Sequence, residues 1–313
     1  MIVALTGATG FLGGAVLERL LGERHEVRAL ARRPQARRPG VTWISGDLAD
    51  EDALAALVEG ADAVIHVAGA INVPTRDAFH AANAEGTRLL AGKARRAGTR
   101  RFILVSSLSA REPGLSDYGW SKREGEVVLA AVAGDASEEG ALDWTIVRPP
   151  AIYGPGDREM LEMFRMAARG IVLLPPSGRL SVIHADDLAE LLVRLAGDRS
   201  GATSGRVFEV DDGTAGGFTH VGFARALGRA VGRRALPVSL PRLVLMAAAR
   251  IDRLLRGGKA KITPDRARYF CHPDWVASPD LQVPPAFWQP GIPAATGLAV
   301  TAAAYREKGW LKS

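Results

Sequence analysis

Short apolar runs and amphipathic stretches alternate through the first half of the chain. The apolar runs are rich in Val, Ile, Leu and Ala, a composition typical of strands buried in a sheet. We expect such strands at Ile2–Thr6, Val27–Ala31, Val41–Ser45, Ala63–Val67, Phe102–Ser106 and Thr145–Arg148. Between them, apolar residues at helical spacing predict helices at Phe11–Leu21, Asp52–Val58, Phe79–Ala97 and Tyr118–Val132. The repeated strand–helix order predicts an α/β fold with a doubly wound parallel sheet.

This regularity falls after Pro149 and Pro150, where glycines, prolines and short elements dominate. Helices are expected in this half at Met160–Ala168, Ala185–Leu195, Phe218–Val231 and Pro241–Leu254. The segment Val207–Val210 is apolar enough to return to the sheet as one more strand. We therefore predict a first domain over residues 1–150, joined by returning segments near 180–211, and a smaller interleaved C-terminal lobe over most of residues 151–313.

A glycine-rich turn, TGATGFLG at residues 6–13, joins the first expected strand to the first expected helix. This layout binds the pyrophosphate of a dinucleotide, as in Rossmann-type sheets. Gly7 permits the tight turn, Gly10 lets the backbone approach the phosphates, and Gly13 lets the helix pack on the strand. Free N–H groups and the positive helix end face the anion. The predicted cofactor contacts in this turn are Gly7, Thr9, Gly10, Phe11, Leu12 and Gly13.

Two arginines, Arg32 and Arg33, end the second expected strand. An acidic residue there would hydrogen-bond the ribose 2′-hydroxyl of NAD, whereas a guanidinium suits a 2′-phosphate. The pair therefore predicts NADP, although it could also be a surface pair in an arginine-rich chain. Further cofactor contacts are expected after the third and fourth strands at Asp47, Leu48, Ala68, Gly69 and Ala70. Asp47 could instead be an acidic residue near a helix N-terminus.

Residues with catalytic chemistry follow the fifth expected strand. Ser106 and Ser107 end that strand, and Tyr118 and Lys122 open the next helix. Tyr118 and Lys122 are four positions apart, so they share one helical face. A phenol, with a pKa of about 10, is a poor base at neutral pH, and we expect a nearby Lys122 ammonium to lower the pKa of Tyr118. Tyr118 would then exchange a proton with a carbonyl or alcohol while a serine hydroxyl orients the reacting oxygen.

With these motifs the chain resembles the extended short-chain dehydrogenases/reductases, in the branch of the epimerase/dehydratase and dihydroflavonol reductase-like proteins. TGATGFLG matches that family's TGxxGxxG, and RPPAIYGPGD at residues 148–157 resembles its RPxxxYGPGD segment. The resemblance covers residues 1 to about 215. It implies four catalytic residues, Ser107, Tyr118, Lys122 and Asn83, the last at the asparagine of the family's NxxGT motif. It also implies cofactor contacts from Tyr118, Lys122, Pro149, Pro150 and Ile152.

The resemblance implies an NADP-dependent oxidoreductase that transfers a hydride between the nicotinamide and a carbonyl or secondary alcohol. A nucleotide-sugar epimerase or dehydratase is an alternative within the family, and Arg158, Arg165 and Arg179 could then meet a diphosphate. The spacing from Ser107 to Tyr118 is only eleven residues, shorter than sugar epimerases usually show. This short loop resembles the branch of the 39-kilodalton accessory subunit of respiratory complex I, so a non-catalytic, NADPH-bound assembly protein is a second alternative. Ser109 could also compete with Ser107 for the orienting role.

Composition limits the classes of partner that we expect. The net charge of +6 comes with arginine doublets scattered between elements without interleaved aromatic residues, so we expect a small-molecule substrate and no nucleic acid. A single cysteine, Cys271, excludes an internal disulfide and fits a reducing, cytoplasmic location. No apolar run is long enough for an integral membrane segment. No metal site is predicted, and a homodimer is left open.

The expected helix over residues 241–256 is amphipathic and basic, and Lys259 and Lys261 follow it. It could contact a membrane surface or a partner, or be a lobe helix with a solvated basic face. We expect the second arrangement, with one apolar face buried against the lobe or a second subunit and no stable membrane association. That face comprises Leu243, Met246, Ala247 and Ile251.

Overall fold

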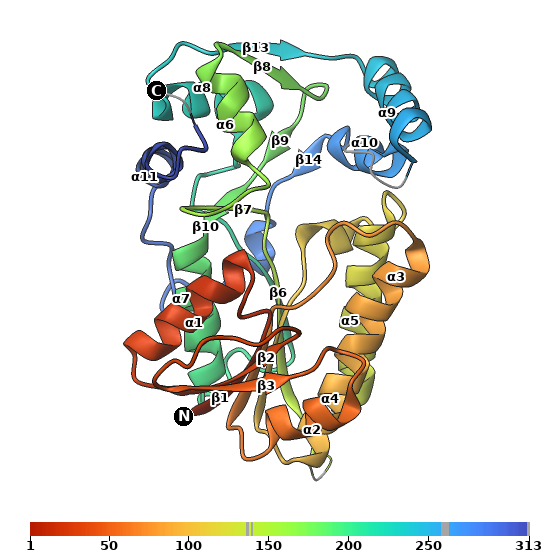
Figure 1. The fold of residues 1–313 in the computed structure, drawn as a ribbon, viewed down its shortest axis with the longest axis vertical. Helices are drawn as coiled ribbons and strands as arrows, with labels where there is room; N and C mark the ends of the chain where they lie inside the picture. Colours follow the sequence, from red (N-terminus) through yellow and green to blue (C-terminus); the bar gives the residue numbers. More distant parts are fainter. Residues whose placement is uncertain (136–137, 139, 258–262, 312–313) are drawn as a thin grey trace. The chain divides into compact units, whose positions relative to one another are not determined.

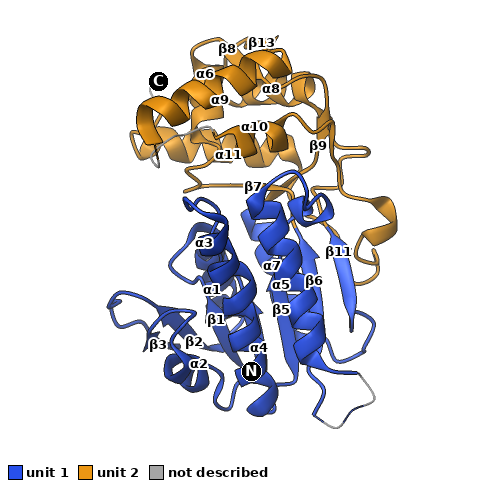
Figure 2. Cartoon of the chain, turned by 90° about the vertical axis from the view of Figure 1, so that its right-hand side faces the viewer, with its two compact units in different colours: residues 1–148, 185–209 blue, residues 149–184, 210–313 orange. Residues whose placement is uncertain are grey.

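The computed structural model describes residues 1–135, 138, 140–257 and 263–311. The chain divides into two compact units (Figure 2). Unit 1 consists of Met1–Arg148 and Ala185–Glu209, and unit 2 of Pro149–His184 and Val210–Ser313. Lys259 and Lys261, which the sequence places after the basic helix, lie outside the described residues.

Unit 1 is built around a seven-stranded parallel sheet (Figure 1). Its strands are β1 (Ile2–Thr6), β2 (Glu26–Ala31), β3 (Val41–Ser45), β4 (Ala63–His66), β5 (Arg101–Val105), β6 (Asp143–Arg148) and β11 (Arg206–Glu209). They lie in the order β11-β6-β5-β4-β1-β2-β3, and every neighbouring pair is parallel. The strand order reverses between β1 and β4, and ligands bind open sheets at the carboxyl end of such a switch point. The predicted doubly wound Rossmann-type fold is confirmed, including the returning strand β11.

Helices cover both faces of this sheet (Figure 1). Helices α1 (Phe11–Gly22) and α7 (Ala185–Gly197) pack together on one face. On the other face, α4 (Gly86–Arg96) packs between α2 (Glu51–Val58) and α5 (Asp117–Ala133). Because both faces are covered, β4 and β5 are buried along their whole length. This explains why their sequences are continuous apolar runs.

The single helix expected over Phe79–Ala97 is wrong in detail. The structure forms α3 (Arg76–His80), a π-helical turn η1 (Ala81–Glu85) and then α4. Thr75 caps α3 by accepting a hydrogen bond from the backbone N–H of Ala78. Single π-helical turns inside helices often accompany functional sites, and η1 contains Asn83.

Unit 2 combines three small sheets with helices. Its strands are β7 (Ala151–Tyr153), β8 (Ile171–Leu174), β9 (Arg179–Leu180), β10 (Val182–His184), β12 (Phe218–Thr219), β13 (Leu236–Ser239) and β14 (Asp274–Trp275). Its helices are α6 (Leu161–Ala168), α8 (His220–Ala230), α9 (Arg242–Arg256), α10 (Pro264–Phe270) and α11 (Ala294–Glu307). Strand β7 pairs with β10, β8 with β13, and β9 lies between β12 and β14.

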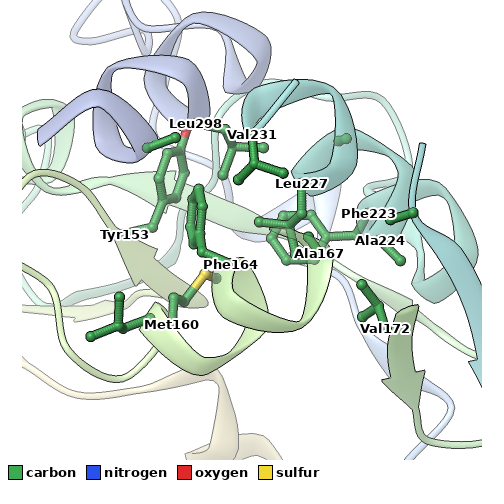
Figure 3. Packing of buried hydrophobic residues seen from close by; sticks show 14 of the residues in the cluster. Tyr153, Met160, Phe164, Ala167, Val172, Phe223, Ala224, Leu227, Val231 and Leu298 are labelled. Carbon is green, nitrogen blue, oxygen red and sulfur yellow. The ribbon is translucent and has the colours of Figure 1, made fainter. Parts of the chain in front are cut away.

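An apolar cluster holds unit 2 together (Figure 3). Phe164 on α6 is fully buried, and its ring meets the ring of Tyr305 on α11 edge-on, with centroids 5.1 Å apart. Leu227 on α8 and Leu298 on α11 are also fully buried in this cluster. The cluster therefore joins three helices that are distant in the sequence.

Two expectations for unit 2 are corrected. The helix expected from Phe218 begins at His220, because Phe218 and Thr219 pair with β9 as β12 and Thr219 caps the helix. The face of α9 that we expected to be buried against the lobe or a second subunit is not buried by the lobe, since Leu243 is 83% and Ile251 57% exposed within this chain.

Candidate active site

The glycine-rich turn after β1 has the geometry that a phosphate-binding turn requires. Gly7 has φ +77°, a conformation that L side chains rarely adopt, and a Cβ there would lie 2.8 Å from the backbone nitrogen of Ala68. A Cβ on Gly13 would lie 1.9 Å from the carbonyl oxygen of Gly7, so only glycine lets α1 pack this close to the turn. Gly10 is the N-cap of α1 and supplies no side-chain cap. The helix thus begins without a protein anion at its positive end, which fits a dinucleotide pyrophosphate.

The ends of β1 and β4 are fixed to each other by a buried hydrogen-bonded chain. Thr6 Oγ1 lies 2.7 Å from His66 Nδ1 and accepts a hydrogen bond from the backbone N–H of Ala68 at 3.1 Å. His66 Nε2 lies 3.2 Å from Thr87 Oγ1. Burial, assisted by the charge of Lys122, lowers the pKa of His66 to about 3, so the imidazole is neutral. His66 holds the turn in place and has no acid–base role.

Asn83 connects the segment after β4 to α5. Its Oδ1 accepts from the backbone N–H of Ala70 at 2.7 Å, and its Nδ2 donates to the carbonyl oxygen of Ala70 at 2.9 Å. Nδ2 also donates to Ser121 Oγ at 2.9 Å. A Cβ on Gly69 would lie 2.7 Å from Asn83 Oδ1. The structure therefore brings the predicted residues Gly69, Ala70 and Asn83 together.

Ser107 and Tyr118 form the centre of the candidate site. Ser107 lies two residues after the end of β5, as the N-cap of a short 3₁₀ helix, η2 (Leu108–Arg111). Ser109 Oγ is fully buried and donates to Ser107 Oγ at 2.9 Å. The Ser107 side chain in turn hydrogen-bonds the phenol of Tyr118 and favours its phenolate form. Ser109 therefore supports Ser107 and does not replace it.

Burial has the larger effect on Tyr118 and raises the pKa of its phenol, with the Ser107 hydrogen bond opposing that shift. The expected lowering by Lys122 is wrong for this arrangement. Lys122 Nζ donates to the carbonyl oxygen of Val105 at 2.7 Å, and burial lowers the pKa of this ammonium to about 8, although the charge of Glu126 opposes the shift. The two side chains share one face of α5 as expected, but burial sets the direction of both pKa shifts.

A buried ion network that the sequence analysis missed lies beneath these residues. Glu126 accepts hydrogen bonds from Ser106 Oγ at 2.6 Å and from two nitrogens of Arg148 at 2.6 and 2.8 Å. Arg148 also lies 3.4 Å from Glu209, which pairs with Arg111. Glu126 is four positions after Lys122, a spacing that could have revealed the contact. The other members of the network, Arg148 on β6 and Glu209 on β11, could be predicted only once the strand order is known.

The remaining predicted cofactor residues take no part in the hydrogen bonds described above. Arg32 and Arg33 follow β2 and are exposed, and among the described residues neither guanidinium has an ion-pair or hydrogen-bond partner. Asp47 is exposed and accepts from the backbone N–H of Ala49, while Asp50 caps α2. The other predicted contacts are Thr9 and Phe11 at the turn, Leu12 buried in α1, Leu48 against the apolar core of unit 1, and Pro149, Pro150 and Ile152 in unit 2.

Two further features are absent from the described part of the chain. No group of His, Cys, Asp or Glu side chains there could hold a metal ion. No helix within the same residues is long and apolar enough to span a bilayer.

Comparisons with known proteins identify the family of the chain. A profile of the NAD dependent epimerase/dehydratase family matches residues 3–211. A protein of Caulobacter vibrioides named ceramide reductase is 39% identical over 323 aligned positions, which cover 99% of this chain and 96% of that protein. The 2-alkyl-3-oxoalkanoate reductase of Stenotrophomonas maltophilia is 31% identical over 236 positions, covering 68% of this chain and 71% of that protein.

Solved structures share the fold. The human epimerase family protein SDR39U1 (isoform 2) with NADPH is 22% identical with a TM-score of 0.73, covering 97% of this chain and 99% of that one. MoeE5 in complex with UDP-glucuronic acid and NAD is 21% identical with a TM-score of 0.71, covering 98% and 99%. The profile spans the sheet and its glycine-rich turn, and a relative aligns along nearly the whole length. The chain belongs to the NAD dependent epimerase/dehydratase family, a branch of the extended short-chain dehydrogenases/reductases.

Proposed function

We propose that this protein is an NADPH-dependent reductase that converts the carbonyl group of a long-chain lipid into a secondary alcohol. The observation that carries the proposal is the hydrogen-bonded pair of Ser107 and Tyr118, with Lys122 on the same helix, in the unit that holds the glycine-rich turn. The substrate class is suggested by the relative named ceramide reductase, which matches almost the full chain.

The protonation state of Tyr118 favours the reductive direction. A phenol already holds its proton at neutral pH, and burial raises its pKa further, so Tyr118 would act as a general acid. A bound nicotinamide would supply the hydride that the carbonyl carbon receives. The Tyr118 proton would move from Oη to the substrate oxygen, where the new O–H bond forms. Ser109 donates to Ser107, which leaves the Ser107 proton free to stabilise the phenolate that remains.

Lys122 and Asn83 would complete the site without touching the proton that is transferred. An ammonium on the same helical face stabilises the Tyr118 phenolate electrostatically. Asn83 bonds the backbone of Ala70 and the hydroxyl of Ser121, and it therefore ties the segment after β4 to α5. In this proposal the catalytic residues act together, and all of them lie in unit 1: Asn83, Ser107, Tyr118 and Lys122.

A nucleotide-sugar substrate is less well supported. The arginines that could meet a diphosphate already contact other parts of unit 2. Arg165 donates to Glu162 and to the carbonyl oxygen of Trp310, and Arg179 donates to the carbonyl oxygens of Gly216 and Gly217. The Arg158 guanidinium lies over the Trp310 ring, 4.7 Å from its centroid. Binding a diphosphate would require these contacts to break.

The test is Tyr118→Phe, which keeps the ring and removes the hydroxyl. With NADPH and a long-chain 3-oxo lipid in mixed micelles, turnover should fall by about 10²–10⁴, the usual contribution of a positioned acid. The NADPH dissociation constant, measured by calorimetry, should stay near the wild-type value. Tyr305→Phe is the matched control, because Tyr305 Oη is buried in unit 2 and lacks a hydrogen-bond partner among the described residues. Equal turnover by the Tyr118 variant and the control would exclude the general acid.

NADP is proposed over NAD because of Arg32. Replacing it with alanine should weaken NADPH binding by about 1.5–3 kcal/mol, the value of a hydrogen bond to a charged group, and change NADH binding little. Arg37, an exposed arginine of the same loop, provides the control. If Arg32→Ala and Arg37→Ala weaken both cofactors alike in calorimetry, Arg32 does not bind the 2′-phosphate.

A further inference from the structure

Helix α9 presents its apolar face to solvent. Its most accessible large side chains are Leu254, Leu243 and Leu255, which are 85%, 83% and 78% exposed. Ile251 and Val244 lie on the same side at helical spacing and are also exposed. The opposite side contains Ala249, which is fully buried, and α9 packs there against α10 (Figure 1). The helix is therefore oriented opposite to an ordinary surface helix, whose apolar stripe faces the core.

Arginines border this apolar face. Arg250 lies next to Leu243 at the border of this face, and Arg253 and Arg242 lie on the same side of the helix but farther round, toward Ala249; all three are exposed. Neither Arg250 nor Arg253 has an ion-pair partner among the described residues. Asp252 is the single acidic residue of α9, and it pairs with Arg256 at 3.1 Å. The edge of the apolar face is therefore positively charged.

Against the expectation from the sequence that this helix does not associate stably with membranes, we propose that α9 docks this protein on an anionic lipid surface. An exposed aliphatic face with arginines along its edge is the arrangement of an interfacial helix, in which leucines enter the acyl boundary and guanidiniums meet lipid phosphates. With fifteen residues, α9 is too short to span a bilayer and can lie only in the plane of its surface. Charge complementarity favours anionic lipid over a second copy of this chain, since a second copy of α9 would bring the same positive edge.

The proposal concerns binding alone and does not depend on the proposed reaction. The full-length protein is sedimented with phosphatidylcholine vesicles that contain phosphatidylglycerol, without substrate or cofactor. We expect it to sediment with these vesicles, to remain mostly in solution with phosphatidylcholine alone, and to bind more weakly as salt is raised. Absence from the anionic vesicles, or equal binding to both kinds, would overturn the proposal.

Matched variants separate the apolar from the charged contribution. Leu254→Gln with Leu255→Gln should reduce partitioning by about tenfold or more, because the buried aliphatic surface is lost. Val127→Gln with Val300→Gln is the control, since these valines are exposed on α5 and α11. Arg250→Gln with Arg253→Gln should reduce binding to anionic vesicles, whereas Arg225→Gln with Arg229→Gln on α8 should not.

Sedimentation velocity tests the alternative that a second copy of this chain covers the apolar face of α9. If the wild-type protein is a dimer that Leu254→Gln with Leu255→Gln converts to a monomer, and neither protein binds vesicles, then α9 pairs two copies and the lipid proposal is wrong. Circular dichroism and thermal unfolding of each variant should match the wild type, because substitutions at exposed positions rarely change stability by more than about 0.5 kcal/mol.

Discussion

The carboxylate of Glu126 connects the candidate catalytic residues to the buried charges of unit 1. It accepts hydrogen bonds from Ser106, next to Ser107, and from Arg148 at the end of β6. It also raises the pKa of Lys122 against the effect of burial. The Glu126 carboxylate therefore acts on both Ser106, next to Ser107, and Lys122. We regard Glu126 as a positioning residue, since nothing places it against the reacting atoms.

Glu126→Gln should shift the pH dependence of turnover. The pKa of Lys122 is about 8 with Glu126 charged, and removing that charge lets Lys122 lose its proton at lower pH. The alkaline limb of the kcat/KM profile should therefore move to lower pH. Glu209→Gln is the matched control, because it removes a carboxylate from the same arginine while Glu126 remains.

Both variants break a buried ion pair and should cost about 3–5 kcal/mol of unfolding free energy. Rates are therefore compared at a temperature where urea titration shows both proteins to be folded. A limb that moves equally in both variants would mean that general destabilisation, and not the Glu126 charge, controls Lys122.

The placement of the candidate catalytic side chains was predictable where it depends on sequence spacing. Their pKa values were less predictable, because these depend on burial. The four-residue spacing of Tyr118 and Lys122 did place them on one face of α5. The direction of the Tyr118 pKa shift did not follow, because desolvation is set by residues from α3 and η2 that pack around the ring, such as Phe79. The roles of Ser107, Asn83 and Arg32 remain predictions.

At the scale of elements, the apolar runs predicted the strands of the large sheet almost to the residue, because buried parallel strands must be continuously apolar. The helix expected over Phe79–Ala97 failed at Asn83. Its side chain bonds Ala70 and Ser121, and the backbone there forms the turn η1. Helical periodicity indicates only which side chains share a face. It does not indicate hydrogen bonds to other segments of the chain.

Helix α9 shows the second limit of periodicity. The pattern predicted an amphipathic helix, and α9 is one. A pattern alone does not say whether the apolar side faces the core, a second molecule or a membrane. The expected burial against the lobe was wrong, because α9 contacts its unit on the side of Ala249. The other expected arrangement, burial against a second subunit, is untested. The vesicle experiment above tests which surface meets the exposed leucines.

At the scale of the whole molecule, the chain forms two units with separate apolar cores. The glycine-rich turn, Asn83, Ser107, Tyr118 and Lys122 all belong to unit 1. Unit 2 is assembled from short strands and helices that the sequence pattern described poorly, because its core joins distant helices such as α6 and α11. Its sequence therefore lacks the repeated strand–helix order that made unit 1 predictable.

Phe164→Ala tests whether cofactor binding depends on unit 1 alone. Phe164 is fully buried in unit 2, so its loss should cost about 3–5 kcal/mol of unfolding free energy, measured by urea titration with tryptophan fluorescence. Calorimetry of the folded variant should give a wild-type NADPH affinity, because every proposed phosphate contact lies in unit 1. Phe102→Ala, at an equally buried position on β5 of unit 1, should be destabilised to a similar degree and also bind NADPH more weakly. If the folded Phe164 variant loses as much affinity as the Phe102 variant, NADPH binding depends on the core of unit 2 as much as on unit 1, and the prediction is wrong.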